Sequence, residues 1–205
     1  MKPEIVVFDI GNVLVEWQPE AYFTGVVGAE RTKAFFKAVP IHRIHHKVDE
    51  GARFSTILEA AEHYPEFEPE LRMWVEDWSK LTANVIEHSV RLLRTLRAKG
   101  IPVWALSNFG EEPFDLSCED HPFLTEFDGA VISGRIGVAK PDVEIYEALE
   151  DATGVLRSRL LFADDRAENI AVAKARGWQT HLFEGPEGWA KALVEAGLLT
   201  EEEAR

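Results

Sequence analysis

Apolar runs of four or five residues recur along this chain, each about the length of a strand. Three strong runs and two weaker ones are Ile5–Phe8, Pro102–Leu106, Leu160–Ala163, Ala130–Ser133 and Gln179–Phe183. Near-continuous apolar runs of this length are typical of parallel strands that are buried on both faces. The pattern therefore predicts a parallel sheet.

Helical periodicity separates several of these runs. The predicted helices cover Val90–Lys99, Asp142–Thr153 and Glu168–Arg176, and a glycine follows each of them: Gly100, Gly154 and Gly177. Glycine is favoured just after a helix because it adopts the left-handed conformation that ends many helices. Strands that alternate with helices predict a doubly wound α/β fold, which is a Rossmann-like core.

Residues 16–88 interrupt this alternation between the first and second strands. They predict several short helices rich in aromatic residues: Trp17, Tyr22, Phe23, Phe35, Phe36, Phe54, Trp74 and Trp78. We interpret this segment as a small helical cap inserted into a core made of residues 1–15 and 89–205. Ligands of open α/β sheets bind at the carboxyl ends of the strands, so we expect the cap to cover that edge. Most of the aromatic residues should pack, with one or two lining a pocket.

Composition narrows the classes of function. The 205 residues carry a formal net charge of −14, which disfavours binding to nucleic acids or to anionic membranes. The single cysteine, Cys118, excludes an intrachain disulfide and a cysteine-based zinc cluster. With no signal peptide or membrane-spanning stretch in the sequence, we expect a cytoplasmic protein, either a monomer or a homodimer.

Polar residues stand where the strands end and in one glycine-bearing loop: Asp9, Ser107-Asn108, Lys140-Pro141 and Asp164-Asp165. Any one of them is also typical of a helix N-cap or a turn. As a set they should converge on one crevice, because the carboxyl ends of parallel strands meet at one edge of the sheet.

This set of residues suits phosphoryl transfer. Asp9 is a candidate nucleophile that would form an aspartyl-phosphate. Asp164 and Asp165 are hard oxygen ligands that, with Asp9 and water, would bind Mg²⁺. Ser107 and Lys140 would hold the oxygens of the phosphoryl group. With Mg²⁺ and Lys140 added, the three carboxylates form a site of no net charge, which can accept an anion although the whole protein is acidic.

Four stretches together resemble the haloacid dehalogenase (HAD) superfamily, in particular its capped phosphatases of the glucose-1-phosphate phosphatase-like and epoxide hydrolase N-terminal phosphatase-like branch. They are Phe8-Asp9-Ile10-Gly11-Asn12-Val13-Leu14-Val15, Leu106-Ser107-Asn108, Ala139-Lys140-Pro141-Asp142 and Phe162-Ala163-Asp164-Asp165-Arg166-Ala167-Glu168-Asn169-Ile170. They follow the family's order and cover nearly the whole chain.

The resemblance implies a role for each matching residue. Asp9 would be the nucleophile, Ser107 would bind the phosphoryl group, and Lys140 would bind that group and orient Asp9. Mg²⁺ would be held by Asp9, Asp164, Asp165 and the backbone carbonyl of Gly11, with Asp165 the more direct of the acidic pair. Asn169 would support the metal site. We further expect a small phosphorylated metabolite, of the sugar phosphate class, to contact Gly11, Asn12, Ser107, Asn108, Lys140 and His46.

One position departs from the family pattern. Most phosphatases of the superfamily carry a second aspartate two residues after the nucleophile, and it protonates the leaving alkoxide; here that residue is Gly11. A proton donor of this kind is worth about 10²- to 10⁴-fold in rate. The cap offers substitutes, with His46 as the first candidate, and Glu16 and Trp17 as further residues at the pocket border.

The nearby His42 and His45 leave other interpretations open. Imidazoles at positions i and i+4 of a helix, here His42 and His46, can share a transition metal. The plainest alternative is that these histidines lie on a helix face that is exposed to solvent.

Two other functions also compete with the phosphatase. One is a 2-haloacid dehalogenase, in which Asp9 would attack carbon without a metal; the other is a non-catalytic binding protein, for which Gly11 is the only support.

Overall fold

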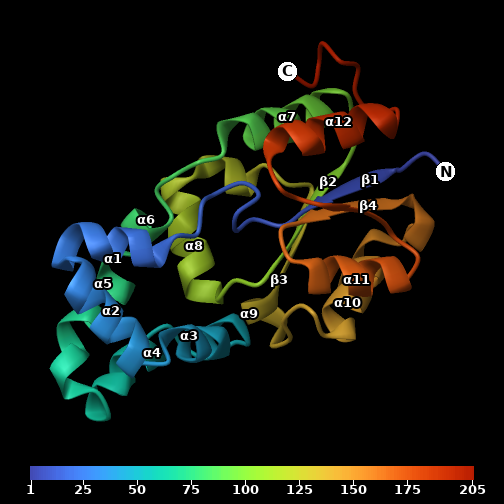
Figure 1. Cartoon of the computed structure of the whole chain (residues 1–205). Helices are drawn as coiled ribbons and strands as arrows, with labels where there is room; N and C mark the ends of the chain where they lie inside the picture. The colour runs from blue at the N-terminus through green and yellow to red at the C-terminus, as the bar shows by residue number, and fades with distance from the viewer.

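A five-stranded parallel sheet forms the centre of the molecule. The computed structural model describes all 205 residues. The sheet has the strand order β3-β2-β1-β4-β5 (Figure 1). The strands are β1 (Ile5–Phe8), β2 (Val103–Ser107), β3 (Gly129–Ile132), β4 (Leu160–Asp164) and β5 (Gln179–Leu182). Each lies within one residue of the run that predicted it, and the doubly wound α/β fold is confirmed.

Two pairs of helices cover the two faces of the sheet (Figure 1). One face carries α10 (Val143–Thr153) and α11 (Ala167–Ala175), and the other carries α7 (Glu87–Ala98) and α12 (Pro186–Glu195). Strand side chains alternate between these layers: Val7 belongs to the first and Phe8 to the second. α7 starts three residues before the predicted Val90. Its first turn is polar, so the apolar periodicity that predicted the helix begins only at Val90. No helix is both long enough and apolar enough to cross a membrane.

The segment between β1 and α7 forms a group of helices at one end of the molecule (Figure 1). These helices are α1 (Pro19–Val27), α2 (Ala29–Ala38), α3 (Ile41–Asp49), α4 (Thr56–Glu59), α5 (Glu68–Glu76) and α6 (Trp78–Leu81). The outgoing and returning chains are hydrogen-bonded, since the Glu16 N–H donates to the Asn84 carbonyl at 2.8 Å and the Ile86 N–H to the Leu14 carbonyl at 2.8 Å. The division into a core of 1–15 and 89–205 and a cap of 16–88 stays a prediction.

The remaining elements are two further helices and four short 3₁₀ turns. They are α8 (Glu111–Asp120), α9 (Ser133–Ile136) and the 3₁₀ turns η1 (Ala60–Glu62), η2 (Pro65–Phe67), η3 (Pro122–Thr125) and η4 (Arg157–Arg159).

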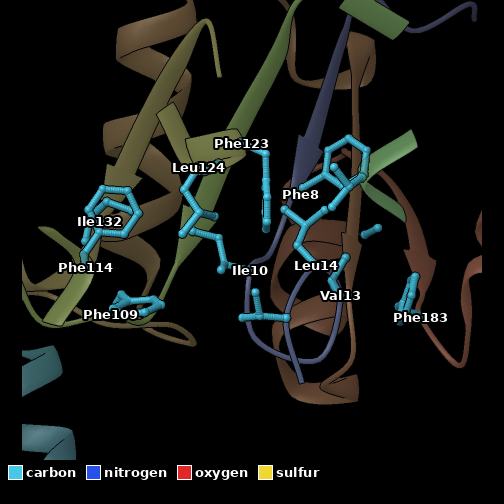
Figure 2. Close-up of a cluster of buried hydrophobic side chains, with 14 of the residues drawn as sticks. Phe8, Ile10, Val13, Leu14, Phe109, Phe114, Phe123, Leu124, Ile132 and Phe183 are labelled. Carbon is cyan, nitrogen blue, oxygen red and sulfur yellow. The ribbon is translucent and has the colours of Figure 1, made fainter. Parts of the chain in front are cut away.

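Buried side chains hold the loop that follows β1. Ile10, Val13 and Leu14 are completely buried, and Figure 2 shows them beside Phe8, with Phe109, Phe123 and Leu124 in the same cluster. Burying side chains of this size stabilises a fold by about 1.5–3 kcal/mol each. The backbone that carries Asp9 and Asn12 is therefore anchored by buried apolar side chains.

Candidate active site

The register of the sheet brings the predicted residues together. Phe8 lies opposite Ala105 of β2 and Ala163 of β4, so Asp9, the next residue, lies level with Asp164. A cavity of about 630 Å³ opens there. Nine of the predicted site residues line it: Asp9, Gly11, Asn12, His46, Ser107, Asn108, Lys140, Asp165 and Asn169. Asp164 is not among the lining residues.

The Asp9 carboxylate is held by one of its two oxygens. Oδ1 accepts hydrogen bonds from the Ile10 N–H at 2.7 Å and from the Ser107 hydroxyl at 2.7 Å, and it lies 2.9 Å from Nζ of Lys140. Burial raises the pKa of Asp9 to about 7, and the nearby Lys140 acts in the opposite direction. Three donors on one oxygen fix the direction in which the carboxylate points.

Lys140 is buried with its charge paired. Its Nζ donates to Asp164 Oδ2 at 2.7 Å and to the Leu106 carbonyl at 2.8 Å, and the two carboxylates raise its pKa against the effect of burial. The side chain of Asn108 braces the backbone of Lys140: its Oδ1 accepts the Lys140 N–H at 2.7 Å, and its Nδ2 donates to the Lys140 carbonyl at 2.8 Å. Asn108 thus positions the lysine, and its contact with substrate stays a prediction.

The two acidic neighbours on β4 occupy different environments. Asp164 is fully buried, and besides Lys140 it accepts hydrogen bonds from the Asn169 amide at 3.0 Å and the Arg166 N–H at 2.8 Å. Asp165 faces the cavity and accepts a hydrogen bond from Asn12 Nδ2 at 3.0 Å. Burial raises the pKa of Asp165, while the Asn12 amide lowers it. Asp164 therefore supports the lysine from behind, and Asp165 is the member of the pair that a ligand can reach.

Asn12 connects the first strand to this acidic group. Its backbone has φ of 55°, in the left-handed region that asparagine adopts more readily than most other residues. From this position its Oδ1 accepts the Trp17 N–H at 2.9 Å while its Nδ2 reaches Asp165. Asn12 lies where substrate was expected, and both ends of its amide already have protein partners.

The carboxylates have the spacing that a small cation requires. Asp9, Asp164 and Asp165 each offer one oxygen, and these oxygens lie within 4.8 Å of one another. Opposite ligands of an octahedral Mg²⁺ site stand about 4.2 Å apart, because each oxygen lies about 2.1 Å from the ion. Hard oxygen donors at this spacing fit Mg²⁺. The aspartates are the only group of three or more metal-ligating side chains of this kind in the molecule.

His42 and His46, the pair considered for a transition-metal site, belong to no such group, so that interpretation is not supported. His45 is buried rather than solvated, its ring lies between Trp17 and Trp78 at centroid distances of 5.6 and 5.4 Å, and its Nδ1 accepts the indole N–H of Trp74 at 3.2 Å. Burial lowers the pKa of His45 to about 3, so its ring is neutral. His46 lines the cavity but is half exposed and lies 3.6 Å from Glu50.

Two further expectations concern the pocket border. Trp17 lines the cavity, as expected. Glu16 does not: its carboxylate accepts a hydrogen bond from the Asn84 amide at 3.0 Å, where the chain returns from the helical segment. Hydrogen bonding between the two crossing chains turns Glu16 away from the site.

Several cavity residues were missed by the sequence reasoning, most notably Asp49, and also Arg43, Thr82 and Phe109. Asp49 ends α3, whose buried residues are Ile41, His45 and Val48. That stripe at i, i+4 and i+7, with Asp49 four residues after His45, is a signal that could have placed this carboxylate at the boundary between the buried face and the cavity.

A family model for haloacid dehalogenase-like hydrolases matches residues 3–177. The chain belongs to this family of hydrolases. The match spans β1 to the end of α11 and includes every predicted site residue, so the HAD resemblance is confirmed.

Among curated proteins, this HAD-like hydrolase is similar to two phosphatases. It is 34% identical over 86 residues to sesquiterpene phosphatase astK of Aspergillus oryzae, covering 42% of this chain and 44% of that protein. It is 30% identical over 104 residues to D-ribitol-5-phosphate phosphatase of Bacteroides thetaiotaomicron, covering 47% of this chain and 50% of that protein. The chain thus spans about half the length of the curated relatives that it matches.

Solved structures share the fold. A HAD family enzyme from Bacteroides thetaiotaomicron, in complex with magnesium and inorganic phosphate, matches 93% of this chain and 98% of its own, with a TM-score of 0.65 and 18% identity. L-2-haloacid dehalogenase from Xanthobacter autotrophicus, with chloropropionic acid covalently bound, matches 96% of this chain and 84% of its own, with a TM-score of 0.64 and 19% identity. Phosphatase and dehalogenase chemistry both occur on this fold, so the site residues must separate them.

Proposed function

We propose that this HAD-like hydrolase is a Mg²⁺-dependent phosphatase that acts on a small phosphorylated metabolite through an aspartyl-phosphate on Asp9. One observation carries the proposal: the buried Asp9 carboxylate shares its site with Lys140 and with a second, cavity-facing carboxylate, Asp165. With Asp164 beside them, these are three acids, which repel one another and any anionic substrate unless a cation joins them. A metal-dependent phosphatase has a use for such a cluster.

Each side chain then has a task. Asp9 attacks phosphorus with a carboxylate oxygen, while Ser107 and Lys140, both already bonded to its Oδ1, orient it and bind oxygens of the phosphoryl group. Asp9, Asp165 and the carbonyl of Gly11 would hold Mg²⁺, with Asp164 close by. The ion would supply positive charge that offsets the charge of the phosphoryl group. Asn12, Asn108 and Asn169 keep these groups in place through the hydrogen bonds described above.

A sugar phosphate is the substrate class that the cavity supports best. Only four of the twenty residues that line it are hydrophobic. The polar and charged side chains among these residues can bind the hydroxyl groups of a sugar. The similarity to a ribitol-5-phosphate phosphatase agrees with this choice, whereas the similarity to a sesquiterpene phosphatase makes an isoprenoid phosphate the alternative to include in the test.

The experiment measures release of inorganic phosphate from a panel of sugar phosphates and one isoprenoid monophosphate, with Mg²⁺ and with EDTA. We expect turnover with Mg²⁺, none with EDTA, and none in Asp9→Asn. Asp151→Asn, which alters an exposed aspartate on α10, is the matched control and should be as active as the wild type.

Two other outcomes would replace the proposal. Release of chloride from 2-chloropropionate that survives EDTA would indicate a dehalogenase. Binding of Mg²⁺ without either product would favour the non-catalytic binding protein.

A further inference from the structure

The cavity contains a third carboxylate for which neither the metal cluster nor phosphate binding provides a role. Asp9, Asp49 and Asp165 are the acidic residues that line it, and the first and last of these belong to the metal cluster. Asp49 is the last residue of α3, on the helical segment that faces the sheet edge, and its side chain is only 14% exposed. It therefore reaches the cavity from the helical segment, whereas Asp9 and Asp165 each follow a strand of the sheet.

The surroundings of Asp49 favour its protonated form. Burial raises the pKa of Asp49 to about 7, and the charges of Glu50 and Asp9 act in the same direction. Lys140 and the backbone of Gly110 act against them. A carboxyl group with a pKa near neutrality can both give and take a proton under working conditions.

A neighbouring buried histidine lies against this carboxyl group. Because the indole N–H of Trp74 can only donate, Nδ1 of the neutral His45 is its acceptor and the ring proton lies on Nε2. That Nε2 lies 3.6 Å from Oδ1 of Asp49. With His45 neutral, this contact is not an ion pair: an N–H group faces Oδ1 from beyond hydrogen-bond distance.

Close packing holds α3 against the core. A Cβ atom on Gly110, in the loop after β2, would lie 2.5 Å from Cγ1 of Val48, and one on Gly51 would lie 3.2 Å from the Gly134 carbonyl. Glycines at these positions let the end of α3 approach the loop that follows Ser107 and Asn108. The position of Asp49 relative to Asp9 is thus set by backbone packing rather than by a mobile side chain.

We propose that Asp49 is the general acid and base of this phosphatase, in place of the aspartate that Gly11 replaces. This inference rests on the function proposed above. His46, the candidate from the sequence, is half exposed and faces Glu50, so it lacks both the shielding and the fixed orientation of Asp49.

Asp49 alone can move the protons in both steps of the reaction, as acid in the first and as base in the second. First, an oxygen of Asp9 bonds to phosphorus, the bond between phosphorus and the alkoxy oxygen of the substrate breaks, and that oxygen takes the proton of Asp49, so the product leaves as an alcohol. Then water attacks the phosphorus, the Asp49 carboxylate takes the proton of the water, and the bond to Asp9 breaks. Inorganic phosphate leaves, and both aspartates return to their starting states.

The test compares leaving groups in Asp49→Asn, with Asp151→Asn, the same change at an exposed aspartate on α10, as the matched control. The substrates are the alkyl phosphate that the wild type hydrolyses fastest and p-nitrophenyl phosphate, whose phenolate leaves without needing a proton. We expect Asp49→Asn to lose about 10²- to 10⁴-fold of kcat on the alkyl phosphate. On p-nitrophenyl phosphate it should give a burst of nitrophenolate followed by slow turnover, with a phosphorylated protein detectable by intact mass.

Several results would overturn the inference. Unchanged alkyl phosphate turnover in Asp49→Asn would do so, as would equal losses on both substrates with no burst, which is the pattern of a structural defect. Circular dichroism monitors folding, and Asp49→Glu provides a second variant: it should retain more alkyl phosphate activity than Asp49→Asn, and an equal loss in both variants counts against a proton-transfer role. A wild type that hydrolyses no phosphate ester would refute the proposed function, and this inference with it.

Discussion

Replacing Gly110 by alanine tests whether the position of α3 controls the site. Gly110 has φ of −63° and ψ of 149°, which any residue adopts, so the effect of the change is steric. The new Cβ atom would lie 2.5 Å from Cγ1 of Val48, 3.0 Å from Cγ of Pro113 and 3.1 Å from the Val48 carbonyl. Carbon atoms pack best at about 3.5–4.0 Å, so the end of α3 must move by about 1 Å.

The expected magnitudes follow from this displacement. Overpacking of this kind costs about 1–3 kcal/mol of stability. Asp49 directly follows Val48, so it moves with the end of α3. A displacement of about 1 Å at such a group can lower kcat about 10²-fold. Gly25→Ala is the control: this glycine is exposed in α1, a Cβ atom there would meet nothing within 4 Å, and kcat should not change.

A double-mutant cycle with Val48→Ala tests whether contact between Gly110→Ala and the Val48 side chain causes the loss of stability. Alone, Val48→Ala should lower the free energy of unfolding by about 2 kcal/mol. Each buried CH₂ group that is removed contributes about 0.8 kcal/mol, and the cavity left behind adds to this loss. In the double variant the clashing methyl group is gone, so the loss of stability in urea denaturation should be smaller than the sum of the single losses by about 1 kcal/mol or more. Losses that add within about 0.5 kcal/mol would show that the two positions do not touch as described.

Two further predictions concern buried ionisable groups. Lys140→Met leaves the Asp9 and Asp164 carboxylates without their cation, so we expect loss of phosphate release and a cost of about 3–5 kcal/mol in urea denaturation; a variant with more than a tenth of wild-type activity would contradict this. His45 has its pKa lowered to about 3, below its unfolded value of 6.5, so the folded state binds fewer protons and loses stability as the pH falls from 6.5 toward 3. Between pH 8 and pH 5 the wild type should therefore lose about 2 kcal/mol more than His45→Gln, and parallel stability curves would show that His45 is not buried in its neutral form.

The sequence identified the nucleophile region because parallel sheets impose a simple geometry. Apolar runs that end in polar residues predicted both the strands and the edge at which Asp9, Ser107 and Asp165 meet. This inference requires only that the strands are parallel and that their carboxyl ends face the same way. Lys140 was assigned to the same crevice from its glycine-bearing loop, and the structure places it between Asp9 and Asp164.

The same pattern could not separate residues that point into the cavity from residues that support it. Asp164 and Asp165 are neighbours in sequence, yet one is fully buried against Lys140 and Asn169 while the other faces the cavity. Successive side chains along an extended chain point in opposite directions, so adjacent acids diverge. Which one turns inward depends on the groups that lie behind the strand, and those come from distant parts of the chain.

In the helical segment, still less of the site could be predicted from the sequence. Its composition indicated helices and aromatic packing, but the roles of its polar residues depended on how α3 is rotated and how closely it meets the loop after β2. Tertiary packing buried His45 in its neutral form, exposed His46, tied Glu16 to Asn84 and brought Asp49 to the cavity. The sequence by itself determined the sheet and the residues at its carboxyl edge. Only the tertiary structure decided which side chains of the helical segment face that edge, because burial and proton affinity depend on contacts between residues far apart in the chain.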